Sequence, residues 1–448
     1  MTRLNALVVI VVSVLLVAVG ASAQFFARDP GVRPGPAGAG RMLDGLTGLQ
    51  PDLFTAGLEE FQEADPLEEG LGPRFNLDSC VGCHSQPAIG GTSPAVNPQV
   101  EVATAFGALN VVPSFITLDG PVREARFKHK PNGTRDGGVH ALFVVSGRND
   151  GTADASGCPI SQDDFEGQLA ADNVIFRIPT PTFGAGLIEQ IPDSTILANR
   201  TANAALKAAF GISGRPNRNG NDGTIARFGW KAQNKSLLLF SGEAYNVEMG
   251  ITNELFQTER DETPECQFTP VPNNLTSSDG TTGPDALSAI EKFAFFMRFL
   301  APPRPSPDTP GGAASIGRGR LLFGAVGCTL CHTPVLRTGP STVEALSDKP
   351  ARLFSDLLVH GMGPGLADDI VQGQAGGDEF RTAPLWGLGK RIFFLHDGRT
   401  TDLLEAIWAH RSLGDLRFRS SEANGVIDLY YTLSQSQKQD VLNFLRSL

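Results

Sequence analysis

Apolar residues recur at helical spacing soon after the first fifty residues of the chain. Within 51–72, Leu53, Phe54, Leu58 and Phe61 fall on one face of a helix and are separated by acidic and polar residues. This pattern predicts an amphipathic helix that packs one face against a core.

Three further stretches carry readable periodicity. In residues 284–300, PDALSAIEKFAFFMRFL, apolar residues recur at helical spacing, which predicts an amphipathic helix. The short runs ALFVVSGR (141–148) and NVIFRIP (173–179) are rich in β-formers and are bounded by turn residues, so they are expected to be strands. We therefore expect a mainly α protein that carries a β-containing insertion.

Turn-forming residues divide the chain into expected domains. Residues 24–50 are rich in glycine, proline and alanine, and they are expected to form a flexible lead-in. Residues 304–314, within APPRPSPDTPGGAA, form the clearest linker in the chain. We therefore expect an N-terminal domain over 51–303, which contains the α+β insertion, and a C-terminal domain over 315–448.

The first residues, MTRLNALVVIVVSVLLVAVGASAQ, have the pattern of a secretory signal peptide. Arg3 precedes an apolar run, and the small residues at 21–23 offer a cleavage site, so 1–23 is expected to be removed on export to the periplasm. An uncleaved anchor is the alternative, because 4–23 is nearly long enough to span a bilayer. No later apolar run reaches that length, so we expect no membrane span in the mature chain.

The charge of the chain bears on its partners. The formal net charge is −11 and the isoelectric point is near 5.2. Nucleic acid is therefore not expected as a partner, because phosphate binding favours a basic surface.

The motif C-x-x-C-H occurs twice, as CVGCH and CTLCH, and uses four of the six cysteines. The two copies comprise Cys80, Cys83 and His84, and Cys328, Cys331 and His332. On a helical turn, positions i, i+3 and i+4 share one face. The two thiols can then bond to the vinyl groups of one haem while the histidine reaches the iron.

Two covalently bound haem c groups are therefore predicted, with His84 and His332 as proximal iron ligands. A Cys₄ zinc site is an alternative, but it would ignore both histidines and bridge distant segments. A redox dithiol is another, but it needs no following histidine and expects a βαβ setting.

The sixth ligand of the C-terminal haem is predicted from a helix-like stripe. In HDGRTTDLLEAIWAH (396–410), Leu403, Ile407 and His410 lie at i, i+4 and i+7, so His410 projects from the apolar face. His410 is the predicted ligand, Met362 is the rival, and a core histidine is the plain structural alternative.

The N-terminal haem has no obvious sixth ligand in nearby sequence. His129 lies in a basic, polar stretch and His140 opens an expected strand, so each is either structural or a candidate ligand. An open sixth position is what a haem that activates peroxide or another substrate needs.

Cys158 and Cys266 are the two cysteines left over. Both lie in turn-rich sequence, and in an oxidising compartment free thiols tend to pair. A disulfide between them is therefore expected, and two separate buried thiols are the alternative.

Beside these features, several stretches resemble the di-haem oxidoreductase family, which is often labelled thiol oxidoreductase-like. The resemblance runs from about residue 43 to the end and lies in GLGPRFNLDSCVGCHSQPAIGG, RIPTPTFGAGLIEQIPD, ARFGWKAQ, LFSDLLVHGMGPGLAD, APLWGLG and FLHDGRTTDLLEAIWAH. The family is similar to bacterial di-haem cytochrome c peroxidases and to the di-haem enzymes that mature a tryptophan-derived quinone cofactor. In those relatives one haem accepts electrons and the other, with an accessible distal side, performs the oxidising chemistry.

The resemblance implies roles for individual residues. In the peroxidases, the matching helix carries a methionine ligand of the electron-transfer haem. Here the helix ends in His410, which implies two histidine ligands and a lower potential for the C-terminal haem. The peroxidases also place a carboxylate over the active haem as a general acid and base, and Glu189 in GAGLIEQIPD is the candidate. A buried or capping glutamate is the alternative for Glu189.

The resemblance also implies a tryptophan relay between the haems and basic partners for the haem propionates. Trp230 is the expected relay, with Trp386 and Trp408 as alternatives, and each can instead be a core residue. Arg399 is the expected propionate partner, together with Arg227, Lys231 and Arg381, and surface ion pairs are the alternative. No free dithiol remains to support the thiol oxidoreductase label once both haems are attached.

The function expected from these features is that of an exported, peroxidase-like di-haem oxidoreductase. One haem would transfer electrons with a small periplasmic redox protein, and the other would act on a small-molecule substrate such as peroxide. A di-haem electron carrier without catalysis and an accessory protein in periplasmic iron handling are the alternatives.

Overall fold

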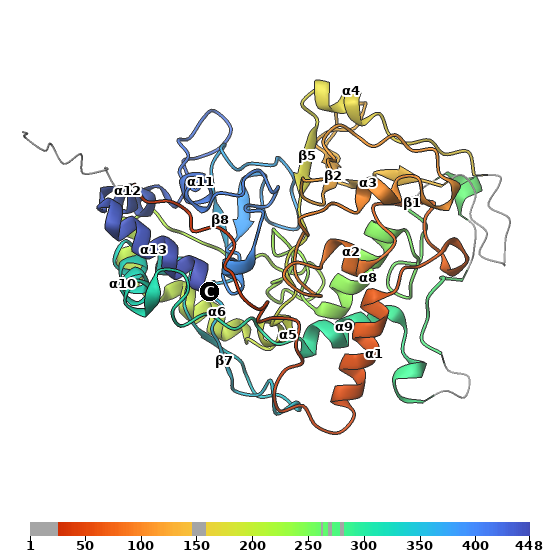
Figure 1. Ribbon diagram of the computed structural model, residues 1–448. Coiled ribbons are helices and arrows are strands. Elements are labelled where there is room, and N and C mark those ends of the chain that lie inside the picture. Colours follow the sequence, from red (N-terminus) through yellow and green to blue (C-terminus); the bar gives the residue numbers. More distant parts are fainter. Residues whose placement is uncertain (1–25, 146–157, 261–262, 268–270, 278–281) are drawn as a thin grey trace, which may run out of the picture.

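The computed structural model describes residues 26–145, 158–260, 263–267, 271–277 and 282–448 (Figure 1). The predicted signal peptide lies outside the described residues, as does the end of the strand predicted over 141–148. None of the helices in the described residues is long and apolar enough to cross a membrane.

Short helices form most of the regular structure in these segments. The α-helices are α1 (Gln50–Gln62), α2 (Cys80–Cys83), α3 (Gln99–Val102), α4 (Phe165–Ala170), α5 (Ala185–Glu189), α6 (Asp193–Thr201), α7 (Ala204–Ala209), α8 (Leu237–Met249), α9 (Ala289–Phe299), α10 (Gly312–Ala325), α11 (Leu403–Trp408), α12 (Asn424–Thr432) and α13 (Gln435–Ser447). The 3₁₀ helices are Leu67–Glu69, Ala105–Gly107, Pro264–Cys266, Gly283–Ala286, Cys328–Leu330 and Leu388–Lys390.

The strands are short, and every pairing among them is antiparallel. They are β1 (Arg74–Phe75), β2 (Glu124–Phe127), β3 (Val139–His140), β4 (Phe143–Val144), β5 (Val174–Arg177), β6 (Leu336–Arg337), β7 (Pro350–Ala351), β8 (Val359–Gly361) and β9 (Glu379–Arg381). The sheet order is β3-β2-β5, and three two-stranded sheets pair β1 with β4, β6 with β7, and β8 with β9. The fold is therefore mixed rather than mainly α, and strands also occur outside the expected insertion.

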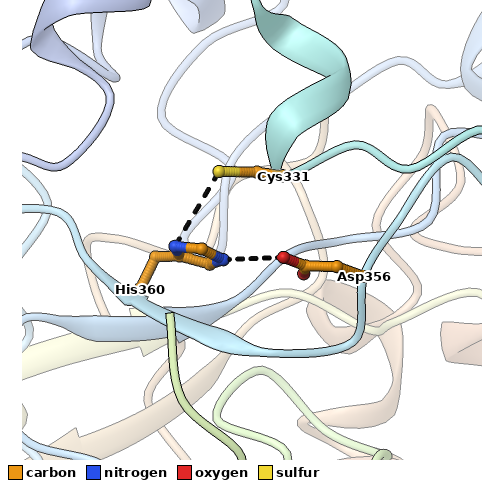
Figure 2. A group of neighbouring side chains, drawn as sticks. All are labelled: Cys331, Asp356 and His360. Atoms are coloured by element: carbon orange, nitrogen blue, oxygen red, sulfur yellow. Dashed lines mark hydrogen bonds and ion pairs between the residues drawn. The ribbon is translucent and has the colours of Figure 1, made fainter. Parts of the chain in front are cut away.

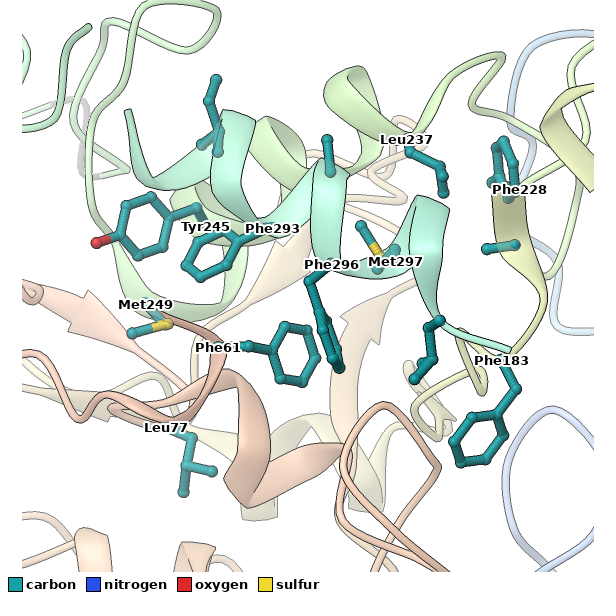
Figure 3. Close-up of a cluster of buried hydrophobic side chains, with 14 of the residues drawn as sticks. Phe61, Leu77, Phe183, Phe228, Leu237, Tyr245, Met249, Phe293, Phe296 and Met297 are labelled. Atoms are coloured by element: carbon teal, nitrogen blue, oxygen red, sulfur yellow. The ribbon is translucent and has the colours of Figure 1, made fainter. Parts of the chain in front are cut away.

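The predicted helix over 284–300 begins later than expected, as α9. Ser288 and Glu291 form a capping box at its start, which satisfies two backbone N–H groups that would otherwise lack partners. The residues 283–286 before it form a 3₁₀ helix instead. The buried face of α9 carries Phe293 and Phe296, which pack against Phe61 of α1 (Figure 3).

Two glycines allow helices to approach closely. A Cβ at Gly57 of α1 would lie 2.3 Å from the carbonyl oxygen of Lys292 in α9. A Cβ at Gly319 of α10 would lie 1.8 Å from the carbonyl oxygen of Asp440 in α13. Both helix pairs therefore need glycine at the contact.

Buried apolar residues form two main clusters. One is built around α1, α8 and α9, and the other around α10, α11 and α13. Figure 1 shows α1, α8 and α9 on the right and α10, α12 and α13 on the left. The first cluster also includes Leu336, Leu353 and Leu358, so the core crosses the boundary that was placed at 304–314.

The segment expected to be a flexible lead-in is tied to the C-terminal helices. The carboxylate of Asp29 pairs with Arg446 of α13, and both side chains are buried. The backbone N–H of Arg33 donates to the carbonyl oxygen of Gly389, and Ala27 joins the C-terminal apolar cluster. Residues 26–49 therefore form part of the packed structure and are not a loose lead-in.

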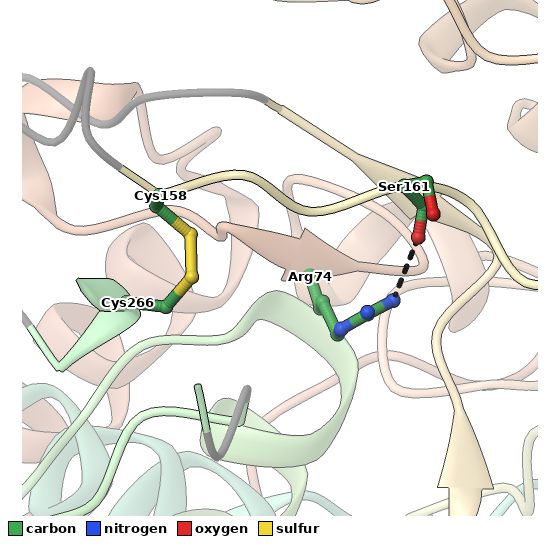
Figure 4. Close-up of a disulfide and its surroundings, with 4 residues drawn as sticks. All are labelled: Arg74, Cys158, Ser161 and Cys266. Carbon is green, nitrogen blue, oxygen red and sulfur yellow. Dashed lines mark hydrogen bonds between the residues drawn. A yellow bond between two sulfur atoms is a disulfide. The ribbon is translucent and has the colours of Figure 1, made fainter. Parts of the chain in front are cut away.

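The predicted disulfide is confirmed. Cys158 and Cys266 are bonded, with their Cα atoms 4.8 Å apart (Figure 4). Near it, a guanidinium nitrogen of Arg74 donates to the carbonyl oxygen of Ser161. The bond closes a loop of 108 residues, which constrains the unfolded chain.

Candidate functional site

Each C-x-x-C-H motif lines its own cavity. The N-terminal cavity has a volume of about 160 Å³ and contains Cys80, Cys83 and His84 in its wall. The C-terminal cavity has a volume of about 220 Å³ and contains the second motif, Cys328, Cys331 and His332. Both walls are mainly apolar, and side chains of the two core clusters contribute to them.

The N-terminal motif folds as predicted from its spacing. Helix α2 spans Cys80 to Cys83, and His84 caps its end. The Nδ1 atom of His84 lies 2.8 Å from the carbonyl oxygen of Gly91. Only a protonated Nδ1 can donate to that oxygen, which leaves the lone pair of Nε2 free to bind a metal.

The C-terminal motif repeats this arrangement on a 3₁₀ turn that begins at Cys328. The Nδ1 atom of His332 lies 3.0 Å from the carbonyl oxygen of Phe354, so Nε2 is again free. Burial lowers the pKa of His332 to about 4 and also lowers that of His84. Both imidazoles are therefore neutral at pH 7, the form that binds iron.

The four motif cysteines are free thiols in separate pairs. Burial raises the pKa of Cys80 and Cys83, and it raises that of Cys328 to about 12. Nearby carboxylates, including Glu248, add to the effect at the first pair. Because the pairs line different cavities, one Cys₄ zinc site cannot be built from them. Two neighbouring cysteines, a free imidazole nitrogen and an apolar cavity fit a haem in each place.

His410 follows the end of α11 and lines the C-terminal cavity as predicted. Its Nδ1 lies 2.8 Å from the carbonyl oxygen of Ala406, so its Nε2 is available in the same way as that of His332. His332 and His410 line the same cavity, and a positive charge on His410 would lower the pKa of His332. Met362 also lines this cavity and remains the rival ligand, and His396 lines it too.

A buried carboxyl pair lines the N-terminal cavity, and it is absent from the sequence-based expectations. Glu124 of β2 and Glu248 of α8 are hydrogen-bonded to one another. Burial and the neighbouring Glu124 raise the pKa of Glu248, so it holds a proton at pH 7. Burial also disfavours the ionised form of Glu124. The positive charge of the adjacent Arg126 outweighs this effect, so the pKa of Glu124 is lowered.

With this geometry in place, comparison with known proteins identifies the family. The family described as "Di-haem oxidoreductase, putative peroxidase" matches residues 132–448. The chain belongs to the di-haem oxidoreductase family. Two haems are therefore the cofactors that family membership implies, in agreement with the two cavities.

Solved structures give only distant similarities to this member of the family. Hydrazine synthase of Kuenenia stuttgartiensis, pressurised with xenon, is 18% identical over 47% of this chain and 60% of that chain, with a TM-score of 0.25. A MauG-like protein associated with microbial copper homeostasis is 18% identical over 36% of this chain and 56% of that chain, with a TM-score of 0.24. The chain thus spans less than two thirds of either neighbour. No curated protein sequence matches it.

Trp230 takes the position that the resemblance implies for a relay. Its side chain lines both the N-terminal and the C-terminal cavity. The indole N–H donates to the carbonyl oxygen of Ile178 over 2.8 Å, which fixes the ring. Trp386 and Trp408 line neither of these two cavities.

Glu189 lies elsewhere, and the structure does not support its expected catalytic role. It lines neither haem cavity. Its carboxylate pairs with Arg298 at 2.8 Å and accepts from the backbone N–H of Leu237 at the start of α8. Glu189 therefore links α5, α8 and α9, because a carboxylate at a helix start satisfies free N–H groups.

Arg399 is also misplaced for its expected role. It is half-exposed, pairs with Asp397 and does not line the C-terminal cavity. Arg381, which was also expected as a propionate partner, lines that cavity together with Arg391, and neither has an ion pair within the part of the chain that the structure describes. Burial lowers the pKa of each to about 10. Buried cations need an anion, and haem propionates are suited to supply it.

His360 completes the polar side of the C-terminal cavity. Its Nε2 pairs with Asp356 at 3.0 Å and its Nδ1 with Glu422 at 2.8 Å. Figure 2 shows its ring between Asp356 and Cys331, whose Sγ lies 3.8 Å from Nδ1. The three could hold a metal ion by distance alone. Because both ring nitrogens are engaged by carboxylates, His360 is better suited to position Cys331 than to bind iron.

The candidate ligands for the N-terminal haem do not reach its cavity. His140 pairs with Asp136 and Asp163 and stacks on Phe127, so its role is structural. His129 lies in a surface loop. Neither residue lines the N-terminal cavity, where His84 is the one histidine among the described lining residues.

Proposed function

We propose that this protein is an exported di-haem c-type oxidoreductase with peroxidase-like chemistry, in which the haems have different roles. The haem of the C-terminal cavity transfers electrons. The haem of the N-terminal cavity reacts with peroxide or another small substrate. The observation that carries this division is the buried Glu124–Glu248 pair, which brings a protonated carboxyl group to the N-terminal cavity.

The N-terminal cavity is suited to the chemical step. When bound, the haem supplies the iron at which a peroxide bond can be broken. Cys80 and Cys83 hold the group covalently, and His84 presents a neutral Nε2 whose orientation is set by Gly91. His84 is the one histidine among the described residues that line this cavity, and Met249 and Met297, which also line it, are the other side chains there that could compete with a substrate for the iron.

The carboxyl pair handles protons. Reduction of hydrogen peroxide to two waters consumes two electrons and two protons. Glu248 holds one proton because burial and Glu124 disfavour its ionised form. Glu124 stays ionised beside Arg126, so the pair can release a proton and take it back without a change in its surroundings.

The C-terminal cavity is suited to electron transfer. Cys328 and Cys331 would attach the haem, and His332 and His410 each present a free Nε2. With both imidazoles bound to its iron, a haem held here would have no position free for substrate and a lower potential than with a methionine ligand. Trp230, which touches both cavities, would link the two centres electronically.

The experiment that tests this proposal is low-temperature EPR with absorbance of the haem-loaded protein, before and after hydrogen peroxide. We expect one high-spin and one low-spin ferric haem, and peroxide should remove the high-spin signal. His410→Ala should alter only the low-spin signal. Glu248→Gln should leave both resting signals unchanged and slow the peroxide reaction by about 10²-fold or more, as the loss of a general acid does.

The matched control is Glu189→Gln, a buried glutamate outside both cavities, which should react with peroxide at the wild-type rate. If both haems are low-spin and peroxide changes nothing, even after half-reduction, the protein is an electron carrier. If Glu248→Gln reacts normally, the assignment of the carboxyl pair is wrong.

A further inference from the structure

Three aromatic side chains form a continuous row near the C-terminal cavity. The rings of Trp408 and Tyr431 meet edge to face with their centroids 4.9 Å apart. The rings of Tyr431 and Tyr430 do the same at 5.4 Å. Trp408 ends α11, and both tyrosines belong to α12, so the row crosses the contact between two helices.

The row has one buried end and one exposed end. Tyr430 is 1% exposed and lines the C-terminal cavity together with Cys328 and His410. Tyr431 is 38% exposed, and Trp408, at the outer end, is 50% exposed. Large aromatic residues are usually buried, so a half-exposed tryptophan stacked in a row that reaches a cofactor cavity calls for a functional reason.

Two cations hold the outer rings in place. The guanidinium of Arg411 lies 5.6 Å from the ring centre of Trp408, and the ammonium of Lys438 lies 5.1 Å from that of Tyr431. Lys438 also donates to the carbonyl oxygen of Tyr431 over 3.0 Å. The rings are therefore ordered by specific contacts, not left loose on the surface.

Exposed leucines occur on α12 and in the loop between α11 and α12, the segments next to Trp408, and charged side chains of these segments are paired. Leu413 is 68% exposed, Leu416 is fully exposed, and Leu429 is 39% exposed. The arginines beside them face carboxylates of nearby elements. Arg411 pairs with Asp428. Arg417 pairs with Asp369.

We propose that this row is the electron entry route of the protein and that the surface around Trp408 docks its redox partner. The partner is a small one-electron redox protein with an apolar, weakly charged face around its cofactor edge, because no single charge sign dominates this surface. This inference rests on the proposed electron-transfer role of the C-terminal haem. One electron leaves the reduced partner, which is oxidised, and reaches the ferric iron in the C-terminal cavity, which is reduced.

No bond is made or broken. The aromatic rings couple the partner's redox cofactor to the iron in the C-terminal cavity without being oxidised themselves. The hydroxyl of Tyr430 is buried and has no hydrogen-bond partner among the described residues. Oxidation of a tyrosine would release its phenolic proton, and here no neighbouring group is positioned to accept it. Trp408 also lies two residues before His410, so the covalent chain offers a second short path to the same haem.

The test is stopped-flow reduction of the oxidised, haem-loaded protein by a reduced mono-haem cytochrome c that has an apolar haem-edge face and a potential below that of the C-terminal haem. Trp408→Leu should slow this reaction by at least about tenfold, as truncation of an interface tryptophan does. Trp408→Phe should retain most of the rate, and Tyr431→Leu should also slow it. Reduction by dithionite, which needs no docking surface, should stay at the wild-type rate in all three variants.

Two further measurements separate the possible outcomes. Calorimetric binding of the oxidised cytochrome reports docking without electron transfer. Trp408→Leu should weaken this binding, whereas Leu109→Ala, at a more exposed apolar control position, should not. Wild-type rates in both Trp408→Leu and Tyr431→Leu would overturn the route. If the cytochrome reduces the protein through Trp408 but peroxide fails to react, the enzyme assignment is wrong and the route stands.

Discussion

The ion pair between Asp29 and Arg446 gives a direct test of whether the N-terminal segment belongs to the packed structure. Arg446 is 1% exposed, and its guanidinium donates to both carboxylate oxygens of Asp29, at 2.7 Å and 2.5 Å. Asp29 also accepts from the backbone N–H groups of Gly31 and Leu403. Asp29→Asn would leave a buried guanidinium without its counter-charge.

Loss of one partner of a buried ion pair costs about 3–5 kcal/mol. We expect about 3 kcal/mol for Asp29→Asn, because the amide keeps one acceptor for Arg446. With a urea slope of about 2–3 kcal/mol per M, the unfolding midpoint should fall by about 1–1.5 M. The double variant Asp29→Asn/Arg446→Met should recover most of this loss, since it removes the buried charge as well.

The assay is urea unfolding of the haem-loaded variants, followed by circular dichroism and by the absorbance of the haems. The matched control is Asp44→Asn, which breaks the exposed pair with Arg41 in the same segment. Burial would raise the pKa of Asp29, but Arg446 outweighs it and lowers the pKa. The Asp29 carboxylate therefore adds its full stability to the fold above pH 3.8, the ordinary pKa of an aspartate, and this stability is lost as the pH falls through the pKa of Asp29 in the folded protein. If Asp29→Asn is no less stable than Asp44→Asn at pH 7, the segment is a loose lead-in after all.

Three other changes test the site and the fold. Cys158→Ser should lower the free energy of unfolding by at most about 4–5 kcal/mol, because the bond closes a long loop, and thermal unfolding with and without reductant measures this. The peroxide reaction should slow as pH rises through about 8, where Glu248 loses its proton, and stopped-flow pH profiles of wild type and Glu248→Gln should differ only in this step. Trp230→Phe should slow electron equilibration between the haems while both resting EPR signals stay unchanged; a normal rate would exclude Trp230 as the link.

Local patterns predicted the elements on which the site is built. The apolar spacing of Leu53, Phe54, Leu58 and Phe61 predicted α1, and the amphipathic pattern over 284–300 predicted α9 within a few residues. The run at 173–179 became β5, whereas 141–148 yielded only β4 within its described part. These predictions were accurate because the periodicity of apolar side chains depends on residues only a few positions apart in the sequence.

Expectations that depended on distant partners were less accurate. The lead-in looked flexible because its composition is rich in glycine and proline, but Asp29 finds Arg446 more than four hundred residues away. Glu189 and Arg399 were chosen from short motifs, and the structure places both outside the haem cavities. Arg381 and Arg391 take the cavity position that Arg399 was expected to hold.

The sequence by itself determined the two haem motifs, because C-x-x-C-H needs only one helical turn to bring two thiols and an imidazole to one face. It also determined the disulfide partners, since only two cysteines remain once the motifs are assigned. Tertiary structure alone decided that Glu124 and Glu248 meet in one cavity wall, that Trp230 lines both cavities, and that an aromatic row leads to the surface. Those arrangements join residues from separate elements, and their burial and mutual charge exist only once the chain is packed.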